Sequence, residues 1–350
     1  MSKCCCSDEI SCCETETSCC AEDTTEDKVH TVSTRLAGKD ILGAWKVRWG
    51  IGRMNYKVEP GLYKVIGADS NSPVLVSANY KLTFDTLRKN LEGLNCWLLI
   101  LDTKGVNVWC AAGEGTFGTE ELVNRIEQTG LAELINHRKL ILPQLGASGV
   151  NAHEITMRTG FSVIFGPIRA GDIKNFISAG MKATKKMRMV RFTFWDRLVL
   201  TPMEITETFK FVLPVLGAMF IFNLFVNRQF GIYDTLLCLG AILSGAFVTP
   251  VLLPFIPGRA FAFKGWLVGL LWAGCTFWLY GWYAPGYWLL VAGYGLLLPA
   301  VSSFLAMNFT GASTYTSPSG VLKEMKIALP FIIGLAFVGA VLVLIKSFWG

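Results

Sequence analysis

The stretch Asn107-Val108-Trp109-Cys110-Ala111-Ala112-Gly113 joins two segments with different patterns. Ahead of it, the unbroken apolar run Trp97–Leu101 is typical of a strand buried on both faces. After it, Thr119 and the two glutamates that follow predict the N-cap and first turn of a helix. The sequence therefore predicts that Cys110 lies in a turn of small residues between a sheet and a helix.

Strands and helices alternate over residues 45–195, which we predict to form one domain. The expected strands are Val74–Ala78, Trp97–Leu101, Lys139–Pro143 and Phe161–Phe165. The expected helices are Thr83–Glu92, the one capped by Thr119, Gly149–Thr159 and Gly171–Gly180. This alternation predicts an α/β domain with a doubly wound, mostly parallel sheet. Ligands bind at the carboxyl ends of the strands in such sheets, and Cys110 follows one of these ends.

The second half of the sequence is far more apolar than the first. The chain has 350 residues, 52% of them hydrophobic, and a mean hydropathy of +0.44, which is too apolar for an ordinary soluble enzyme. We predict an all-α membrane domain over residues 196–350, acting mainly as an anchor, with no charged side chain inside a span. The five expected transmembrane helices are about 209–226, 235–256, 265–283, 287–307 and 327–345.

Basic residues predict the orientation in the membrane. A cluster precedes the first apolar run, and further basic residues recur in alternate loops. The cluster is Lys182, Lys185, Lys186, Arg188 and Arg191. We therefore expect a multi-pass protein of the inner (cytoplasmic) membrane, with the α/β domain in the cytoplasm. The net charge of +6 is modest, so we expect no nucleic-acid partner.

Residues 1–44 read as a flexible, acidic, cysteine-rich tail without the pattern of a secretory signal peptide. Their cysteine spacing is not that of a structural zinc site. Two interpretations stay open: incidental thiols, or a trap for thiophilic ions such as Hg(II), since thiolates select soft metals. The cysteines concerned are Cys4, Cys5, Cys6, Cys12, Cys13, Cys19 and Cys20.

Four roles are open for Cys110 from the residues alone. It could be a buried structural thiol, a nucleophile, a redox thiol or a metal ligand. No histidine lies close in sequence, and Cys96 is the only nearby cysteine. The flanking alanines and glycines favour an open surface for a large planar ligand, and a following helix amino terminus favours the thiolate.

The stretch from Asp102 to Thr119 resembles the signature of corrinoid proteins related to the large subunit of the corrinoid iron–sulfur protein of the acetyl-CoA pathway. The resemblance covers roughly residues 55–195 and extends through 56–63, 73–80, 140–147 and 166–170. Joined to membrane spans, such a domain resembles the family of mercury-methylating membrane corrinoid proteins. The resemblance implies a cobalt corrinoid (cobalamin) as cofactor.

In that family the motif cysteine is the lower axial ligand of cobalt, which implies this catalytic role for Cys110. The implied reaction transfers a methyl group from cobalt to Hg(II), giving methylmercury, and an anionic thiolate would stabilise the Co(III) left behind. The implied partners are a small ferredoxin-like protein with two four-iron four-sulfur clusters and a methyl-folate-type donor protein. The implied cofactor-binding residues are Asn107, Val108, Trp109, Cys110, Ala111, Ala112, Gly113, Gly115 and Thr116.

One residue departs from the family pattern: Glu114 stands where the family has lysine. A carboxylate is tolerable near a helix amino terminus, but it would repel an anionic corrinoid phosphate or a thiolate on Cys110. Two other functions therefore stay open. One is a corrinoid methyl carrier of one-carbon metabolism, and the other is a non-enzymatic membrane protein that binds metal ions.

Overall fold

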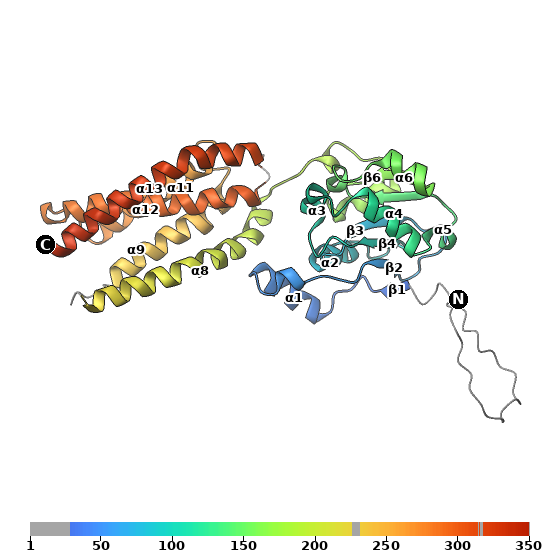
Figure 1. Ribbon diagram of the computed structural model, residues 1–350, viewed down its shortest axis with the longest axis horizontal. Helices are drawn as coiled ribbons and strands as arrows, with labels where there is room; N and C mark the ends of the chain where they lie inside the picture. The colour runs from blue at the N-terminus through green and yellow to red at the C-terminus, as the bar shows by residue number, and fades with distance from the viewer. Residues whose placement is uncertain (1–28, 226–231, 314, 316–317, 350) are drawn as a thin grey trace, which may run out of the picture. The chain divides into compact units, whose positions relative to one another are not determined.

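The computed structural model describes residues 29–225, 232–313, 315 and 318–349. They fall into two compact units. Residues 57–187, with the described residues before Leu36, form an α/β unit, and residues 36–56 with those from Arg188 onward form a helical unit. Figure 1 labels most of the elements of both.

The α/β unit is built on a mixed, mostly parallel sheet of six strands in the order β1-β2-β4-β3-β5-β6. Each pair of neighbours is parallel except β2 and β4, which are antiparallel. The prediction of a mostly parallel α/β sheet is confirmed, but β1 and β2 were not predicted. The strands are β1 Val29–Val32, β2 Gly61–Val65, β3 Val74–Ala78, β4 Trp97–Leu101, β5 Lys139–Leu142 and β6 Ser162–Phe165.

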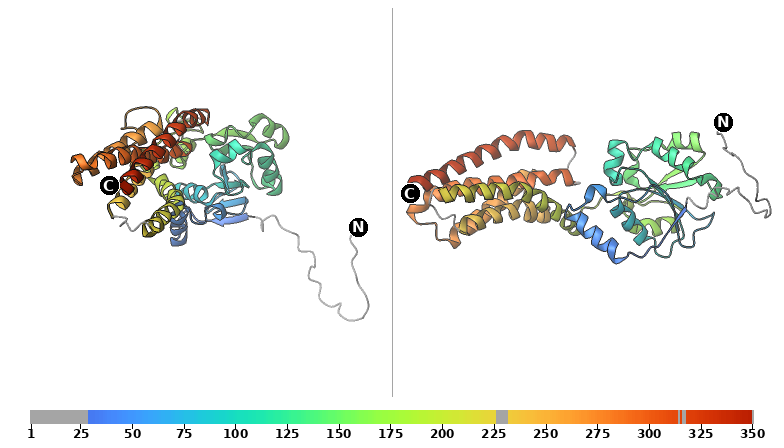
Figure 2. Two further views of the ribbon diagram at one scale, coloured as in Figure 1. Left: turned by 60° about the vertical axis from the view of Figure 1, so that its left-hand side comes forward. Right: turned by 60° about the horizontal axis from the view of Figure 1, so that its bottom comes forward.

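Helices cover both faces of this sheet (Figure 2). Leu99 and Leu101 of β4 belong to an apolar cluster on one face, whereas Leu98 and Ile100 belong to a cluster on the other. This explains why β4 is apolar without a break. The first face carries α3 Val108–Glu114, α4 Thr119–Gln128, α5 Leu131–Leu134 and α6 Ala152–Thr159; the second carries α2 Lys81–Asn90 and α7 Ile173–Ser178.

The predicted N-cap at Thr119 is wrong. Gly118 holds the extended cap position, and Thr119 is the first residue of α4. The Thr119 hydroxyl instead accepts a hydrogen bond from the Asn151 amide at 2.9 Å. The side chain thus joins the starts of α4 and α6 rather than capping its own helix.

The helical unit contains a bundle of helices that lie side by side, as Figures 1 and 2 both show. A π-helical turn, Ser244–Val248, joins its helices α9 and α10. The helices of the unit are α1 Gly38–Arg48, α8 Phe194–Phe225, α9 Ile232–Leu243, α10 Thr249–Leu252, α11 Phe261–Leu279, α12 Trp288–Asn308 and α13 Pro318–Trp349.

Four stretches among the described residues are long and apolar enough to cross a membrane, not the five that we predicted. They are Asp234–Leu252, Phe261–Leu279, Pro285–Gly311 and Ser319–Lys346, which indicates a membrane protein. The predicted first span falls at the carboxyl-terminal end of α8 and just past it. That helix has two internal prolines and five charged residues: Asp196, Arg197, Glu204, Glu207 and Lys210.

The expectation that the spans lack charged side chains is also wrong. Lys210 already falls inside the predicted first span. Asp234 begins the first apolar stretch and accepts a hydrogen bond from the Tyr294 hydroxyl at 2.6 Å. Lys264 of α11 donates to the Leu253 carbonyl. Asp234 and Lys264 thus each have a hydrogen-bond partner within the helical unit, as polar groups in an apolar environment require.

Candidate functional site

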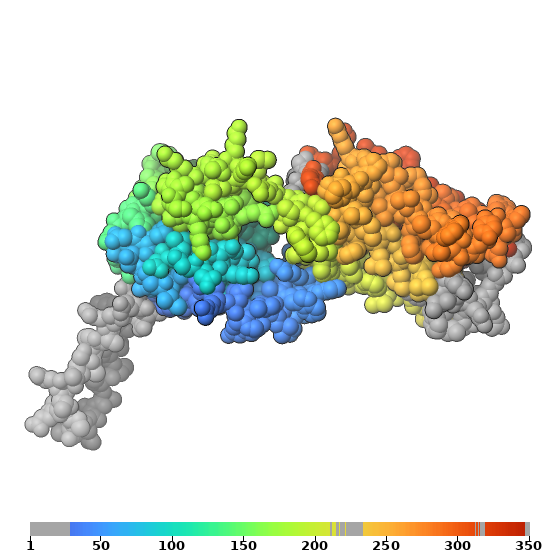
Figure 3. Space-filling model, turned by 180° about the vertical axis from the view of Figure 1, so that it is seen from behind, coloured from blue at the N-terminus to red at the C-terminus, as the bar shows by residue number. Residues whose placement is uncertain are grey.

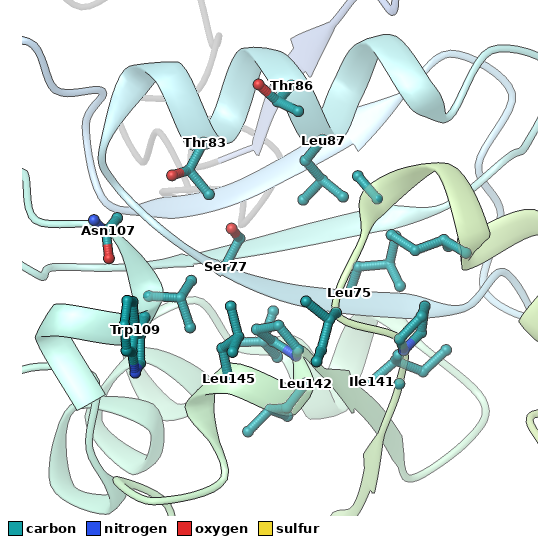
Figure 4. Close-up of a pocket in the computed structure, with 18 of the residues that line it drawn as sticks. Leu75, Ser77, Thr83, Thr86, Leu87, Asn107, Trp109, Ile141, Leu142 and Leu145 are labelled. Carbon is teal, nitrogen blue, oxygen red and sulfur yellow. The ribbon is translucent and has the colours of Figure 1, made fainter. Parts of the chain in front are cut away.

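A cavity of about 430 Å³ opens at the carboxyl ends of β3, β5 and β6 (Figure 4). Thr83 and Leu87 of α2 stand on one side, Leu142 and Leu145 on the other, and Trp109 of α3 at one end. The lining is mostly apolar and consists of Leu75, Val76, Ser77, Tyr80, Leu82, Thr83, Thr86, Leu87, Asn107, Val108, Trp109, Ile141, Leu142, Pro143, Leu145, Gly166, Pro167, Ile168, Ala170 and Ile173.

The sheet topology explains why the cavity lies there. The chain leaves β3 toward α2 on one face, but it leaves the adjacent strand β4 toward α3 on the other. Diverging connections leave a crevice beyond the carboxyl ends of neighbouring parallel strands, which is where such sheets bind ligands. The predicted location of the site therefore coincides with a cavity.

Cys110 is the third residue of α3 rather than part of a turn, which corrects our prediction. Asn107 is the N-cap of this helix, and its side-chain oxygen accepts a hydrogen bond from the Cys110 amide at 3.0 Å. The Cys110 thiol is exposed. Its neighbour Trp109 is 49% exposed and lines the cavity, so the motif combines an accessible cysteine with a side chain of the apolar hollow.

Asn79, which follows β3 directly, fixes the loop that leads into α3. Its side chain is 1% exposed, and its oxygen accepts from the Thr103 amide at 3.2 Å, the Thr103 hydroxyl at 2.9 Å and the Gly105 amide at 2.9 Å. Its amide nitrogen donates to Asp102 at 3.0 Å. Lys104 and Gly105 both have the left-handed φ of a tight turn. Because buried polar groups are costly to leave unpaired, this network holds the start of α3 firmly.

The alanines of the motif form the underside of α3, not an open surface as we predicted. Ala111 is 0% and Ala112 is 5% exposed, and both pack in the core with Phe117. A side chain at Gly149 would collide with the Phe117 backbone and crowd Ala112. The small residues therefore allow α3 to approach the 144–149 turn closely, whereas Gly113 and Gly115 remain exposed.

The predicted cofactor-binding residues divide into two groups. Asn107, Val108 and Trp109 line the cavity, whereas the other six do not. Cys110, Gly113 and Gly115 are exposed, and the Thr116 hydroxyl donates to the Ala111 carbonyl at 3.4 Å. The seven tail cysteines lie outside the described residues.

Glu114 is the last residue of α3 and is exposed. We had expected the Glu114 carboxylate to be tolerated because it would lie near the amino terminus of a helix, and this expectation is wrong. The macrodipole at the carboxyl end of α3 disfavours a carboxylate and favours the cation that the family pattern carries.

Sequence reasoning missed two contributions to the site. One is Asn79, and the other is the 166–173 segment with its 3₁₀ turn Ala170–Asp172, which walls the cavity. Both follow directly after strands of the sheet. Their position at carboxyl ends was the signal that could have identified them.

Cys96 is not a redox partner for Cys110. It is 0% exposed in the apolar cluster on the opposite face from α3. Burial raises the pKa of its thiol to about 12. Within the described ranges, no three His, Cys, Asp or Glu side chains gather as a metal site. Any metal bound at Cys110 by these residues would thus have fewer than three such ligands.

Comparison with known proteins places the α/β unit among relatives. Residues 49–177 match the model of the family CdhD, CO dehydrogenase/acetyl-CoA synthase delta subunit. The acetyl-CoA decarbonylase/synthase complex subunit gamma of Methanocaldococcus jannaschii is 37% identical over 122 residues, covering 34% of this chain and 25% of the relative. The corresponding subunit of Archaeoglobus fulgidus is 35% identical over 127 residues, covering 36% and 27%.

The chain thus spans about a quarter of the length of the curated relatives it matches. The likeness applies to the unit that carries the cavity, Asn79 and Cys110. Residues 49–177 are therefore similar to the CdhD family and to the gamma subunits of acetyl-CoA decarbonylase/synthase complexes, and they precede a helical region with four long apolar stretches.

Proposed function

We propose that this protein is a membrane-anchored, corrinoid-dependent methyltransferase that transfers a methyl group from cobalt to Hg(II), giving methylmercury. Cys110 is the proposed lower axial ligand of cobalt. The observation that carries the proposal is the exposed Cys110 on α3, next in sequence to Trp109, which lines an apolar cavity at the carboxyl ends of the strands. The four long apolar stretches support the membrane anchor.

The residues present fit a corrinoid. A large planar ligand needs open space beside the thiol, and a side chain built at Gly113 meets nothing within 4 Å. The lining of the adjoining cavity is mostly apolar, and a single thiolate is a soft donor suited to a polarisable metal centre. A bound corrinoid would supply a cobalt-bound methyl group, which the electrophile Hg(II) accepts together with its bonding electrons.

The chain's own residues have distinct tasks in this proposal. Cys110, whose side chain is exposed, would hold the metal of the cofactor through its sulfur. Asn107 holds the helix turn that carries Cys110, and Asn79 holds the loop before it. Trp109 and Leu145 line the hollow and give it apolar walls. The tail cysteines are proposed to collect Hg(II) before transfer.

Repeated turnover needs two partners in this proposal. A small ferredoxin-like protein with two four-iron four-sulfur clusters would return the cobalt to its reduced state, and a methyl-folate-type donor protein would remethylate it. A second candidate function is a corrinoid methyl carrier of one-carbon metabolism. The likeness to gamma subunits of acetyl-CoA decarbonylase/synthase complexes favours that alternative.

A single-turnover experiment separates the two functions without either partner. The full chain is loaded with methylcobalamin in detergent, its visible spectrum is recorded, and methylmercury is measured after addition of Hg(II). We expect a spectrum that differs from free methylcobalamin and formation of methylmercury. Cys110→Ala should abolish the spectral difference and lower the yield roughly 10- to 100-fold.

Cys275→Ala is the matched control, because Cys275 is also an exposed cysteine but lies in α11. It should leave the spectrum and the yield unchanged. A Cys110-dependent spectrum without methylmercury would favour the methyl carrier. A Cys110→Ala spectrum identical to that of the wild type would overturn the axial-ligand assignment.

A further inference from the structure

Helix α1 and the turn after it expose an unusual amount of apolar surface. Figure 3 shows this segment, in blue, open at the surface. The exposed fractions are 60% for Ile41, 54% for Leu42, 57% for Trp45, 58% for Ile51 and 80% for Met54. We call these five residues the α1 patch. Contiguous exposed apolar surface of this kind marks an interaction site.

The apolar and the basic side chains of α1 point in different directions around the helix axis. At about 100° per residue, Ile41, Leu42, Trp45 and Trp49 fall within an arc of about 100°. Arg48 flanks this arc on one side, and Lys39 and Lys46 flank it on the other. An apolar arc with basic residues on both borders is typical of a helix lying in a membrane interface, where lysine and arginine reach toward the headgroups.

The opposite side of α1 is buried, and the helix belongs to the helical unit. Val47 and Asp40 point away from the arc and are 3% and 6% exposed. Helix α1 packs against α8, where a side chain at Gly50 would meet the Met203 sulfur at 3.3 Å. A hollow lined by Trp45, Trp49, Ile51 and Thr206 continues the apolar surface onto α8. The patch thus belongs to the unit that contains the four long apolar stretches.

We propose that the α1 patch lies in the interface of the bilayer and binds anionic lipid. The bilayer is the occupant for two reasons. The patch is continuous with the unit that contains the candidate spans, and the surrounding charge is basic, with Lys39, Lys46, Arg48 and Arg53 on the same segment. This inference rests on the membrane part of the proposed function, and it assigns a lipid contact outside the four candidate spans.

The test places one genetically encoded environment-sensitive fluorophore at a time in the full chain, reconstituted into vesicles with nitroxide-labelled lipid. The labelled positions are Trp45 in the patch, Phe337 of α13 and Glu127 of α4, an exposed residue of the α/β unit. Vesicles are made of phosphatidylcholine alone or with phosphatidylglycerol. We expect quenching at 337 in both vesicles and no quenching at 127. At 45 we expect at least twofold stronger quenching with phosphatidylglycerol than without it.

A quadruple variant with Lys39, Lys46, Arg48 and Arg53 changed to glutamine should remove that lipid dependence and leave quenching at 337 unchanged. A label at Leu42 repeats the test should the Trp45 label disturb the fold. The inference is overturned if lipid quenches the label at 337 but quenches the labels at 45 and 42 no more than the label at 127. This conclusion also holds if iodide in the water fails to quench the labels at 45 and 42, because protein rather than lipid then covers them. Absence of quenching at 337 would instead refute the membrane spans themselves.

Discussion

The surroundings of Cys96 and of Cys110 differ completely, although each cysteine lies beside a tryptophan in the sequence. Cys96 immediately precedes β4 and is 0% exposed among apolar side chains. Cys110 lies in the first turn of α3 with an exposed thiol. Chemistry at a thiol requires access, which the fold gives to Cys110 but not to Cys96, because Cys96 is part of the core.

The largest expected difference between the two regions is in thiol reactivity. Iodoacetamide labelling, read by peptide mass spectrometry, should modify Cys110 in the native protein and Cys96 only after unfolding. The rates should differ by at least about 10³-fold, because Cys96 reacts only from the unfolded state. Burial raises the Cys96 pKa to about 12, so roughly 1% of it would be thiolate at pH 10 even if reagent could enter.

Raising the pH to 10 should therefore leave Cys96 protected. Denaturant serves as the control, since it should make both cysteines reactive in the same sample. Comparable native rates for Cys96 and Cys110 would show that the core around β4 opens far more easily than its packing indicates.

The second prediction concerns the network that holds the Cys110 region. Asn79→Ala removes four hydrogen bonds and leaves the Thr103 and Gly105 amides without that acceptor. We expect a loss of roughly 2–4 kcal/mol in the stability of the α/β unit. Labelling of Cys96 reports its opening and should accelerate roughly 30- to 1,000-fold, since each 1.4 kcal/mol is a factor of ten.

Asn90→Ala is the matched control, because Asn90 makes a single 2.8 Å bond to the Thr86 carbonyl on α2. It should change the Cys96 rate less than about twofold. An Asn79→Ala protein with the wild-type Cys96 rate would mean that the network adds nothing to the stability of this unit.

Three of the four strands that the sequence predicted share one physical property. Strands β3, β4 and β5 lie in the sheet interior and are covered on both faces, so each is a run of apolar residues. Strand β1 is at an edge and has polar residues at His30 and Thr31. Strand β2 includes Lys64, which lies over the Trp97 ring at 5.4 Å. Lys64 interrupts the apolar pattern of β2, and Trp97, the residue that it contacts, is remote in sequence. The local pattern therefore did not indicate a strand.

The site shows the same limit. Asn107, Val108 and Trp109 are adjacent in sequence, so one motif contained all three of the predicted residues that line the cavity. The role of Asn79 depends on partners at Asp102 to Gly105, which only the parallel pairing of β3 and β4 brings close. Similarly, Ala112 is buried because Gly149 approaches it, a contact that local pattern could not indicate.

The smallest expected effect concerns two helix caps. It distinguishes an effect on Cys110 alone from an effect on the stability of the whole α/β unit. Asn107 caps α3 through the Cys110 amide at 3.0 Å, and Asn151 caps α6 through the Glu154 amide at 3.3 Å. Either change to alanine should cost about 1 kcal/mol in the stability of the α/β unit. Denaturant titration followed by Cys96 labelling measures both losses on the same scale.

Only Asn107→Ala should also alter Cys110 itself, because it frees the first turn of α3 while Asn151 lies on another helix. We expect the Cys110 labelling rate in the native state to change two- to fivefold in Asn107→Ala and to stay at the wild-type value in Asn151→Ala. Asn107→Ser retains a neutral capping oxygen and should restore the wild-type rate. If Asn151→Ala changed the Cys110 rate as much, the cap would act through the stability of the whole unit, and the distinction between the two cysteine environments would no longer rest on the geometry of α3.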